Sequence, residues 1–132
     1  MKKGLVIVHT GDGKGKTTAA FGLALRAVGH GMKVIVVQFI KSSHKTGEKK
    51  ASKLLFPALQ VIPMGYGFVN LKDRKSMEKA KLKAEKTLRF VRDCIAAGKP
   101  DVIILDELNN AVSYGLIPVE EVVDIINTKP RK

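Results

Sequence analysis

The sequence of 132 residues has few sulfur and aromatic side chains, with one cysteine, no tryptophan, two tyrosines and five phenylalanines. A single cysteine, Cys94, cannot form a disulfide within the chain, and its place in a helical pattern predicts buried packing and not a reactive thiol. The aromatic residues are too scattered among the lysines to build the base-stacking platforms of a nucleic-acid binder.

Long apolar segments are also lacking. No apolar run reaches the roughly 18 residues that a membrane span needs. The first residues lead into a predicted strand without a signal-peptide cleavage pattern, as the letters MKKGLVIVHT show. We therefore expect a single cytoplasmic domain, residues 1–132, with no membrane partner and with enough chain to bury a core.

The charge balance is strongly basic, with 24 Lys and Arg residues against 12 Asp and Glu residues and a net charge of +12. Such an excess is also found in nucleic-acid binders. Here, however, much of it lies in residues 41–53 and in residues 72–92, and the second range is a predicted helix with a polar face. An anionic substrate or a solvated face accounts for the charge equally well, so we expect no nucleic-acid partner.

A glycine-rich segment, TGDGKGKTT at residues 10–18, lies between an apolar run and a predicted helix. Its three alternate glycines let successive backbone N–H groups turn toward one anion, and the helix adds its positive N-terminal end. Lys16 would place its ammonium on phosphate oxygens, and the Thr17 hydroxyl would ligate a magnesium ion. The segment predicts a loop that binds a triphosphate through Gly11, Asp12, Gly13, Lys14, Gly15, Lys16, Thr17 and Thr18.

The loop is shorter than usual. The common pattern GxxxxGK[ST] requires a glycine at position 10, where this sequence has Thr10, so the loop counted from Gly11 is one residue short. A shorter loop makes a differently shaped anion site, and the motif alone does not decide which phosphate lies deepest.

Alternating apolar runs and helical patterns predict an α/β fold of the P-loop NTPase kind, with a mostly parallel sheet and helices on both faces. Strands are expected at residues 5–9, 34–40, 59–64 and 101–105. Helices are expected at residues 17–29, 73–97, 108–114 and 118–126.

The packing faces of these elements follow from the spacing of apolar residues. The first strand should be buried, with Ile7 in the core. The long helix should begin at the N-cap Asp73 and end at Gly98. Two further helices should also face the core with their apolar residues. These are Phe21, Ala24, Leu25 and Val28 in the helix at residues 17–29, and Val119, Val122, Val123 and Ile126 in the helix at residues 118–126.

Two segments after predicted strands are candidates for chemistry. Asp106 and Glu107 follow the fourth apolar run and resemble a Walker B segment, whose acids hold magnesium directly or through water. The segment MGYGFVN, residues 64–70, places Tyr66 and Phe68 in a glycine-rich loop at the sheet edge where α/β proteins bind ligands. A loop that Phe68 tucks onto the core is an equal alternative.

Five segments together resemble the P-loop type of ATP:corrinoid adenosyltransferase. They are TGDGKGKTTAAFG at 10–22, RAVGHG at 26–31, VVQFIK at 36–41, MGYGF at 64–68 and ILDELNNAVSYGLIPVEEV at 104–122. The resemblance implies that cob(I)alamin or a related corrinoid attacks the 5′ carbon of ATP, forming a cobalt–carbon bond and releasing inorganic triphosphate. In this family the nucleotide lies in reverse, its γ-phosphate taking the usual place of an α-phosphate.

The resemblance also implies roles for single residues. Lys16 and Phe68 become the expected catalytic residues, with Phe68 approaching the lower face of the corrin and helping to expel the axial ligand. Thr17 and Glu107 match the positions associated with magnesium, with Asp106 supporting them. Asn70 stands where many members carry tryptophan, a departure that bears on lower-face packing and on corrinoid preference.

Partners and completeness are further implications of the resemblance. The family suggests a homodimer and a flavoprotein-type reductant. It also continues beyond the last predicted helix into a strand ending in Thr-Gly-Arg and a corrinoid-side tail, neither of which occurs in residues 1–132. We therefore expect a C-terminally truncated domain that lacks its C-terminal strand and binds ATP better than it transfers adenosyl groups.

Two other classes remain as alternatives. Another P-loop enzyme, a nucleoside kinase or an ATPase, would also have the strand, the loop and the Asp-Glu pair, but it would release ADP or a phosphorylated product. A basic nucleic-acid-binding module without catalysis would show a steep salt dependence of binding.

Overall fold

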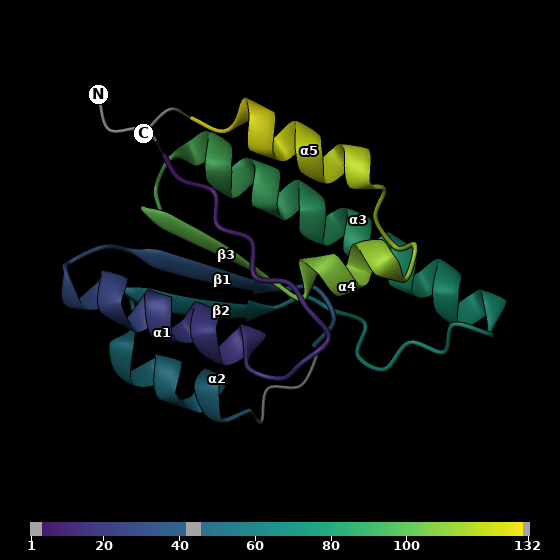
Figure 1. Ribbon diagram of the computed structural model, residues 1–132, viewed down its shortest axis with the longest axis horizontal. Coiled ribbons are helices and arrows are strands. Elements are labelled where there is room, and N and C mark those ends of the chain that lie inside the picture. Colours follow the sequence, from purple (N-terminus) through teal and green to yellow (C-terminus); the bar gives the residue numbers. More distant parts are fainter. Residues whose placement is uncertain (1–3, 42–45, 131–132) are drawn as a thin grey trace.

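The computed structural model describes residues 4–41 and 46–130, and its centre is a three-stranded parallel sheet (Figure 1). The strands lie in the order β2-β1-β3 and are β1 (Val34–Gln38), β2 (Leu59–Pro63) and β3 (Val102–Asp106). These strands confirm three of the four that the sequence predicts.

The register of the sheet brings the ends of β1 and β3 together. Gln38 pairs with Pro63 on one side and with Asp106 on the other. Because parallel strands all end at the same edge, the loops that carry polar side chains also gather there. Gln38 and Asp106 therefore lie next to each other at that edge of the sheet.

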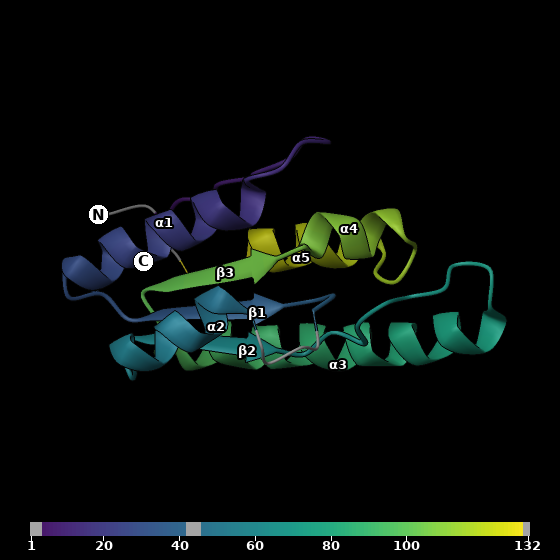
Figure 2. The ribbon, with the colours of Figure 1, turned by 90° about the horizontal axis from the view of Figure 1, so that it is seen from below.

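Helices cover both faces of the sheet, which confirms the predicted fold class (Figures 1 and 2). One face packs against α1 (Lys16–Gly29) and the short turn η1 (Lys53–Leu55), through a core of Ala24, Ala27, Val34, Val36, Leu59 and Val61. The helix α2 (Gly47–Ser52) directly precedes η1.

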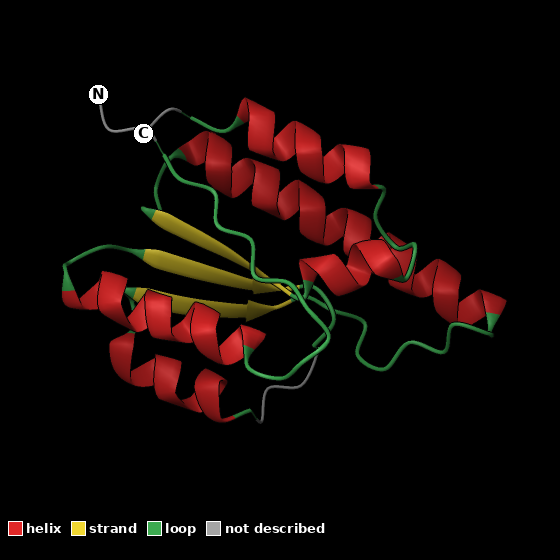
Figure 3. Ribbon diagram, viewed as in Figure 1, coloured by secondary structure: helices red, strands yellow, loops and turns green. Residues whose placement is uncertain are grey.

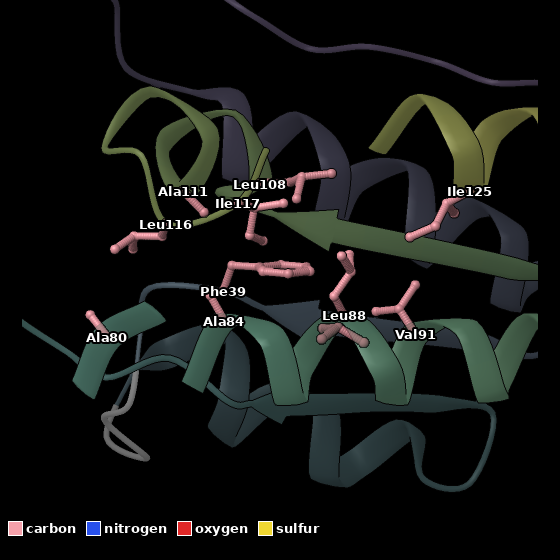
Figure 4. Close-up of a cluster of buried hydrophobic side chains, with 11 residues drawn as sticks. Phe39, Ala80, Ala84, Leu88, Val91, Leu108, Ala111, Leu116, Ile117 and Ile125 are labelled. Carbon is pink, nitrogen blue, oxygen red and sulfur yellow. The ribbon is translucent and has the colours of Figure 1, made fainter. Parts of the chain in front are cut away.

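The other face packs against α3 (Arg74–Ala97), α4 (Leu108–Ser113) and α5 (Val119–Thr128). Figure 4 shows its core, in which Phe39 lies between the helices. The buried residues are Val37, Phe39, Ala80, Ala84, Leu88, Val91, Leu108, Ala111, Leu116, Ile117 and Ile125. None of the described helices is long and apolar enough to cross a membrane.

The ends of α3 agree with the sequence. The Asp73 carboxylate accepts a hydrogen bond from the backbone N–H of Ser76 at 3.1 Å, and Gly98 ends the helix with a φ of 62°. Arg92 of α3 donates to Glu121 and Asp124 of α5 at 2.7 Å each, which ties the two helices together. Cys94 is half-buried on α3, and burial, with a smaller effect of Asp93, raises the pKa of its thiol.

The predicted strand at residues 5–9 is wrong. Residues 4–10 form no strand and lie outside the sheet, drawn as a green loop in Figure 3 and as the purple trace in Figure 2. Leu5 is 85% exposed, and Ile7, which was expected in the core, is 58% exposed. The segment is held at its ends, where Lys129 Nζ donates to the Gly4 carbonyl and Asn109 Nδ2 donates to the His9 carbonyl.

Two predicted helix faces also need correction. On α1, Leu25 is 59% exposed and Ala27 is buried instead. On α5, Val119, Val123 and Ile126 are exposed, whereas Ile125 is buried and Val122 is partly buried. Each helix buries only one or two residues in the core, namely Ala24 and Ala27 on α1 and Ile125 on α5. The apolar residues of the sequence cover a wider face, so their spacing does not show which of them are buried.

Candidate phosphate and metal site

The glycine-rich loop leads directly into α1, as the sequence predicts. Gly11 and Gly15 have φ values of 129° and 105°, in a region that side-chain-bearing residues rarely adopt. Lys16 Nζ donates to the carbonyl oxygens of Gly11 at 2.5 Å and Gly13 at 2.6 Å. The ammonium is therefore held within the loop by carbonyl groups, at the position from which it could exchange these partners for phosphate oxygens.

The loop is joined to β3 by one hydrogen bond. Thr17 Oγ1 donates to Asp106 Oδ1 at 2.9 Å, across 89 positions of the sequence. Asp106 is only 5% exposed, and its second oxygen accepts from Gln38 Nε2 at 3.2 Å. The structure thus brings together two residues that the sequence assigns to the same magnesium site.

Lys41 lies beside Asp106, and Glu48 lies beside Lys41. Together with Gln38 and Glu107 these three residues form the corner at the ends of β1 and β3. Lys41 Nζ lies 3.6 Å from Asp106 Oδ2 and 3.5 Å from Glu48 Oε1 on α2. The side chains of Lys41 and Glu48 are each 27% exposed, so solvent screens this pair less than a fully exposed one. A carboxylate that is nearly buried therefore has a cation beside it.

Glu107 is placed by an unusual backbone conformation. It is the N-cap of α4 and has a φ of 61°, the only positive φ of a non-glycine residue among those described. Such strain gathers at functional sites, where the surrounding structure maintains it. Desolvation raises the pKa of the Glu107 carboxyl, Lys41 opposes the increase, and Asp106 and Glu48 add to it.

Two buried oxygens in this corner have no hydrogen-bond partner. They are Glu107 Oε2 and Gln38 Oε1, and Gln38 has no exposed surface. Unpaired buried acceptors are costly and rare, and they mark a place where a donor or a cation is expected.

The donor set fits a hard divalent cation. Thr17, Asp106 and Glu107 offer hydroxyl and carboxylate oxygens, which Mg²⁺ prefers. In the described residues no group of three or more His, Cys, Asp or Glu side chains converges on one point. Such a site would therefore complete its shell with water and phosphate oxygens, as Mg²⁺ usually does in nucleotide sites.

The segment with Phe68 lies against the chain that follows β1. The N–H groups of Gly65 and Gly67 donate to the carbonyls of Lys41 at 3.2 Å and Ile40 at 2.9 Å. A Cβ on Gly65 would overlap the Ile40 carbonyl, so only glycine allows this approach. Phe68 itself is 94% exposed, and the alternative in which Phe68 tucks the loop onto the core is wrong.

No motif in the sequence identifies Gln38, Lys41 or Glu48 as site residues. Gln38 ends an otherwise apolar run, and a buried polar residue at the carboxyl end of a central strand is a signal that could have identified it. Lys41 and Glu48 lie in the basic range of residues 41–53, in which no motif indicates a site.

The parallel sheet, the glycine-rich loop before α1 and the Thr17–Asp106 contact are features of a P-loop NTPase-like α/β fold. Comparison with protein families then matches residues 2–132 to the family described as ATP:corrinoid adenosyltransferase BtuR/CobO/CobP. The match extends over nearly the whole sequence. The chain belongs to this family.

Curated relatives are similar over the same extent. The chain is 40% identical to the corrinoid adenosyltransferase of Escherichia coli strain K12, with 99% of this chain and 65% of the relative covered. Corrinoid adenosyltransferase CobA of Salmonella typhimurium is 38% identical, with 98% of this chain and 64% of the relative covered. The chain thus spans slightly less than two thirds of the length of these relatives.

Proposed function

We propose that this protein transfers the 5′-deoxyadenosyl group of ATP to the cobalt(I) centre of a corrinoid and releases inorganic triphosphate. The observation that carries the proposal is the 2.9 Å hydrogen bond between Thr17 and Asp106, which joins a phosphate-type loop to an acid pair in a chain of this family. The name of the family supplies the two substrates, ATP and a corrinoid.

The reaction is an alkyl transfer. An electron pair of cobalt(I) forms the bond to C5′, and the C5′–O bond breaks with its electrons going to the triphosphate, while the cobalt becomes formally cobalt(III). Negative charge then grows on the leaving group. Lys16 and the N–H groups of residues 11–17 would stabilise that charge, since donors fixed in advance are most effective where charge develops.

Magnesium is the cofactor that we propose for the same step. Thr17, Asp106 and Glu107 are the residues that would hold it, directly or through water, beside the phosphates. When bound, the ion would neutralise part of the triphosphate charge. The two unpaired buried oxygens of Gln38 and Glu107 support a cation in this corner.

The corrinoid is proposed to approach over the segment at residues 64–68. The exposed ring of Phe68 is available to a large planar ligand, because it is not used in the protein core. The role that we propose for Phe68 is to help displace the lower axial ligand of the corrinoid. Asn70 lies two residues further on and accepts a hydrogen bond from the backbone N–H of Lys72, so its side chain is engaged locally.

The setting of the reaction is proposed in the same way. We propose that the protein is a cytoplasmic homodimer, and that the cobalt of the bound corrinoid is reduced by a flavoprotein-type reductant. The reductant is needed because cobalt must reach the +1 state before it can attack carbon.

Phosphoryl transfer is the second candidate, because the contact between Thr17 and Asp106 also suits a P-loop ATPase or nucleoside kinase. The two candidates differ in the bond that is broken. Cleavage at C5′ leaves the three phosphates joined, whereas phosphoryl transfer separates the γ-phosphate from ADP.

The test is a direct assay. The protein is incubated with ATP, magnesium and chemically reduced cobalamin, and the absorbance change of cobalt–carbon bond formation is followed. An increase that requires ATP, and that the Lys16→Ala variant loses, supports the proposal. ADP and phosphate released in place of triphosphate, without cobalt–carbon bond formation, would contradict it.

A further inference from the structure

Among the residues that the structure describes, one ammonium, that of Lys41, forms an ion pair with Asp106. The carboxylate takes hydrogen bonds from Thr17 and Gln38, but both donors are neutral. Lys41 Nζ, 3.6 Å from Asp106 Oδ2, supplies the positive charge that a nearly buried carboxylate needs.

Two carboxylates lie beside this ammonium, and a third lies near enough to be influenced by its charge. Asp106 and Glu48 lie 3.6 and 3.5 Å from Lys41 Nζ, and Glu107 is close enough for all three charges to act on its pKa. Counted over the described side chains Asp106, Glu107, Glu48 and Lys41, three negative charges face one positive charge. A second cation therefore has an electrostatic reason to enter.

The position of Lys41 is fixed through its backbone. Its carbonyl accepts from Gly65 N–H, and the preceding carbonyl of Ile40 accepts from Gly67 N–H. Only the Lys41 side chain is left to move. With 27% of that side chain exposed, the ammonium can leave Asp106 and keep its contact with Glu48.

Two buried oxygens near Asp106 are acceptors that an additional cation could satisfy. Gln38 is fully buried, donates to Asp106 through Nε2, and leaves Oε1 without a partner. Glu107 Oε2 is also buried and unpaired. Lys41 satisfies neither oxygen, so it neutralises only part of the corner.

We infer that Lys41 is a resident counter-cation of the metal site, holding Asp106 while no divalent cation is bound and competing with that cation for it. This inference rests on the magnesium site of the proposed function. Lys41 is a positioning residue: it prevents repulsion among Asp106, Glu107 and Glu48 in the empty site and lowers the affinity for a metal that arrives without nucleotide.

The test measures binding of Mn²⁺ alone, without ATP or corrinoid, from the loss of the electron paramagnetic resonance signal of the free ion. Replacing the ammonium by an apolar chain of similar length, in Lys41→Met, should lower the Kd for Mn²⁺ by about tenfold or more. Lys41→Arg keeps the charge and should stay within about threefold of the unaltered protein.

The matched control is Lys50→Met on α2, an exposed lysine near Glu48 in the sequence but without a contact to Asp106 among the described hydrogen bonds and ion pairs. It makes the same change in net charge and should alter the Kd less than about threefold. Thermal unfolding is measured on each variant, and Lys41→Gln replaces Lys41→Met if the latter does not fold.

Three results would overturn the inference. The first is Mn²⁺ binding that is unchanged or weaker in Lys41→Met, and the second is equal tightening in Lys50→Met. The third is tightened binding that persists when Glu107→Gln is added to Lys41→Met, because the ion would then bind elsewhere. The adenosyl-transfer assay is separate, so its failure with a positive Mn²⁺ result would reject only the proposed reaction.

Discussion

Two apolar runs of similar composition have opposite environments in this molecule. Val36 in β1 has no exposed surface, whereas Val8 in the segment before the phosphate loop is 66% exposed. The difference lies in their neighbours, since β1 pairs with β2 on one side and β3 on the other, while residues 4–10 pair with no strand in the described part of the chain. Burial here depends on what surrounds a run, and not on its apolar character alone.

The candidate site likewise has one part that the sheet holds in place and one part that is exposed. Its sheet half is fixed, because Asp106 ends a paired strand and is bound by Thr17, Gln38 and Lys41. Its loop half is exposed, and Lys16 is held there by carbonyl groups of the loop itself. Under the proposed function, the sheet half is prepared before ligands bind, and Lys16 in the loop half would exchange its carbonyl partners for phosphate oxygens.

The largest effect is expected in the loop half. Lys16→Ala should raise the activation barrier of adenosyl transfer by about 3 to 4 kcal/mol, because a fixed positive charge at the leaving group is lost. Turnover should then fall roughly a hundred- to a thousandfold. Its melting temperature should change little, since the contacts that Lys16 makes within the loop are exposed. Near-normal turnover would show that the loop does not hold the triphosphate.

The next effect compares the two apolar runs with the same substitution. Val36→Ala should lower the free energy of unfolding by about 2 kcal/mol, because it leaves a cavity between β1 and α1. Val8→Ala should change it by less than about 0.5 kcal/mol, as expected for an exposed side chain. Urea denaturation measures both. Equal losses would mean that the segment with Val8 is buried in solution.

This pair of valines also shows how far the sequence could be interpreted. Three strands and the bounds of α3 followed from apolar runs, the N-cap Asp73 and Gly98, which are local signals. The position of residues 4–10 did not, because a strand needs a partner that a local pattern cannot identify. In the site, Lys16, Thr17 and Asp106 were predicted from motifs, while Gln38 needed the register of β1 against β3, and Lys41 needed the path of the chain after β1.

A smaller effect is expected where the loop half meets the sheet half. Thr17→Ala removes the donor to Asp106 and should lower the free energy of unfolding by about 1 kcal/mol. It should also raise the magnesium concentration needed for half-maximal activity. Thr17→Ser keeps the hydroxyl and is the matched control. If the serine variant needs as much magnesium as the alanine variant, the hydroxyl is not the group that matters.

The smallest effect on stability is expected at Phe68. Phe68→Ala should leave the free energy of unfolding within about 0.5 kcal/mol, because the ring is 94% exposed. Activity should fall more when the reaction starts from cob(II)alamin and a reductase than when it starts from preformed cob(I)alamin. Equal losses from both starting points would remove Phe68 from the displacement of the axial ligand.

The most direct measurement of the central claim is the identity of the phosphate product. Phosphorus NMR of a reaction with ATP, magnesium and reduced cobalamin distinguishes inorganic triphosphate from ADP and free phosphate. Adenosyl transfer predicts triphosphate in an amount equal to the cobalt–carbon bonds formed, and it predicts its loss in Lys16→Ala. ADP and phosphate as the products, formed equally well without the corrinoid, would contradict the account.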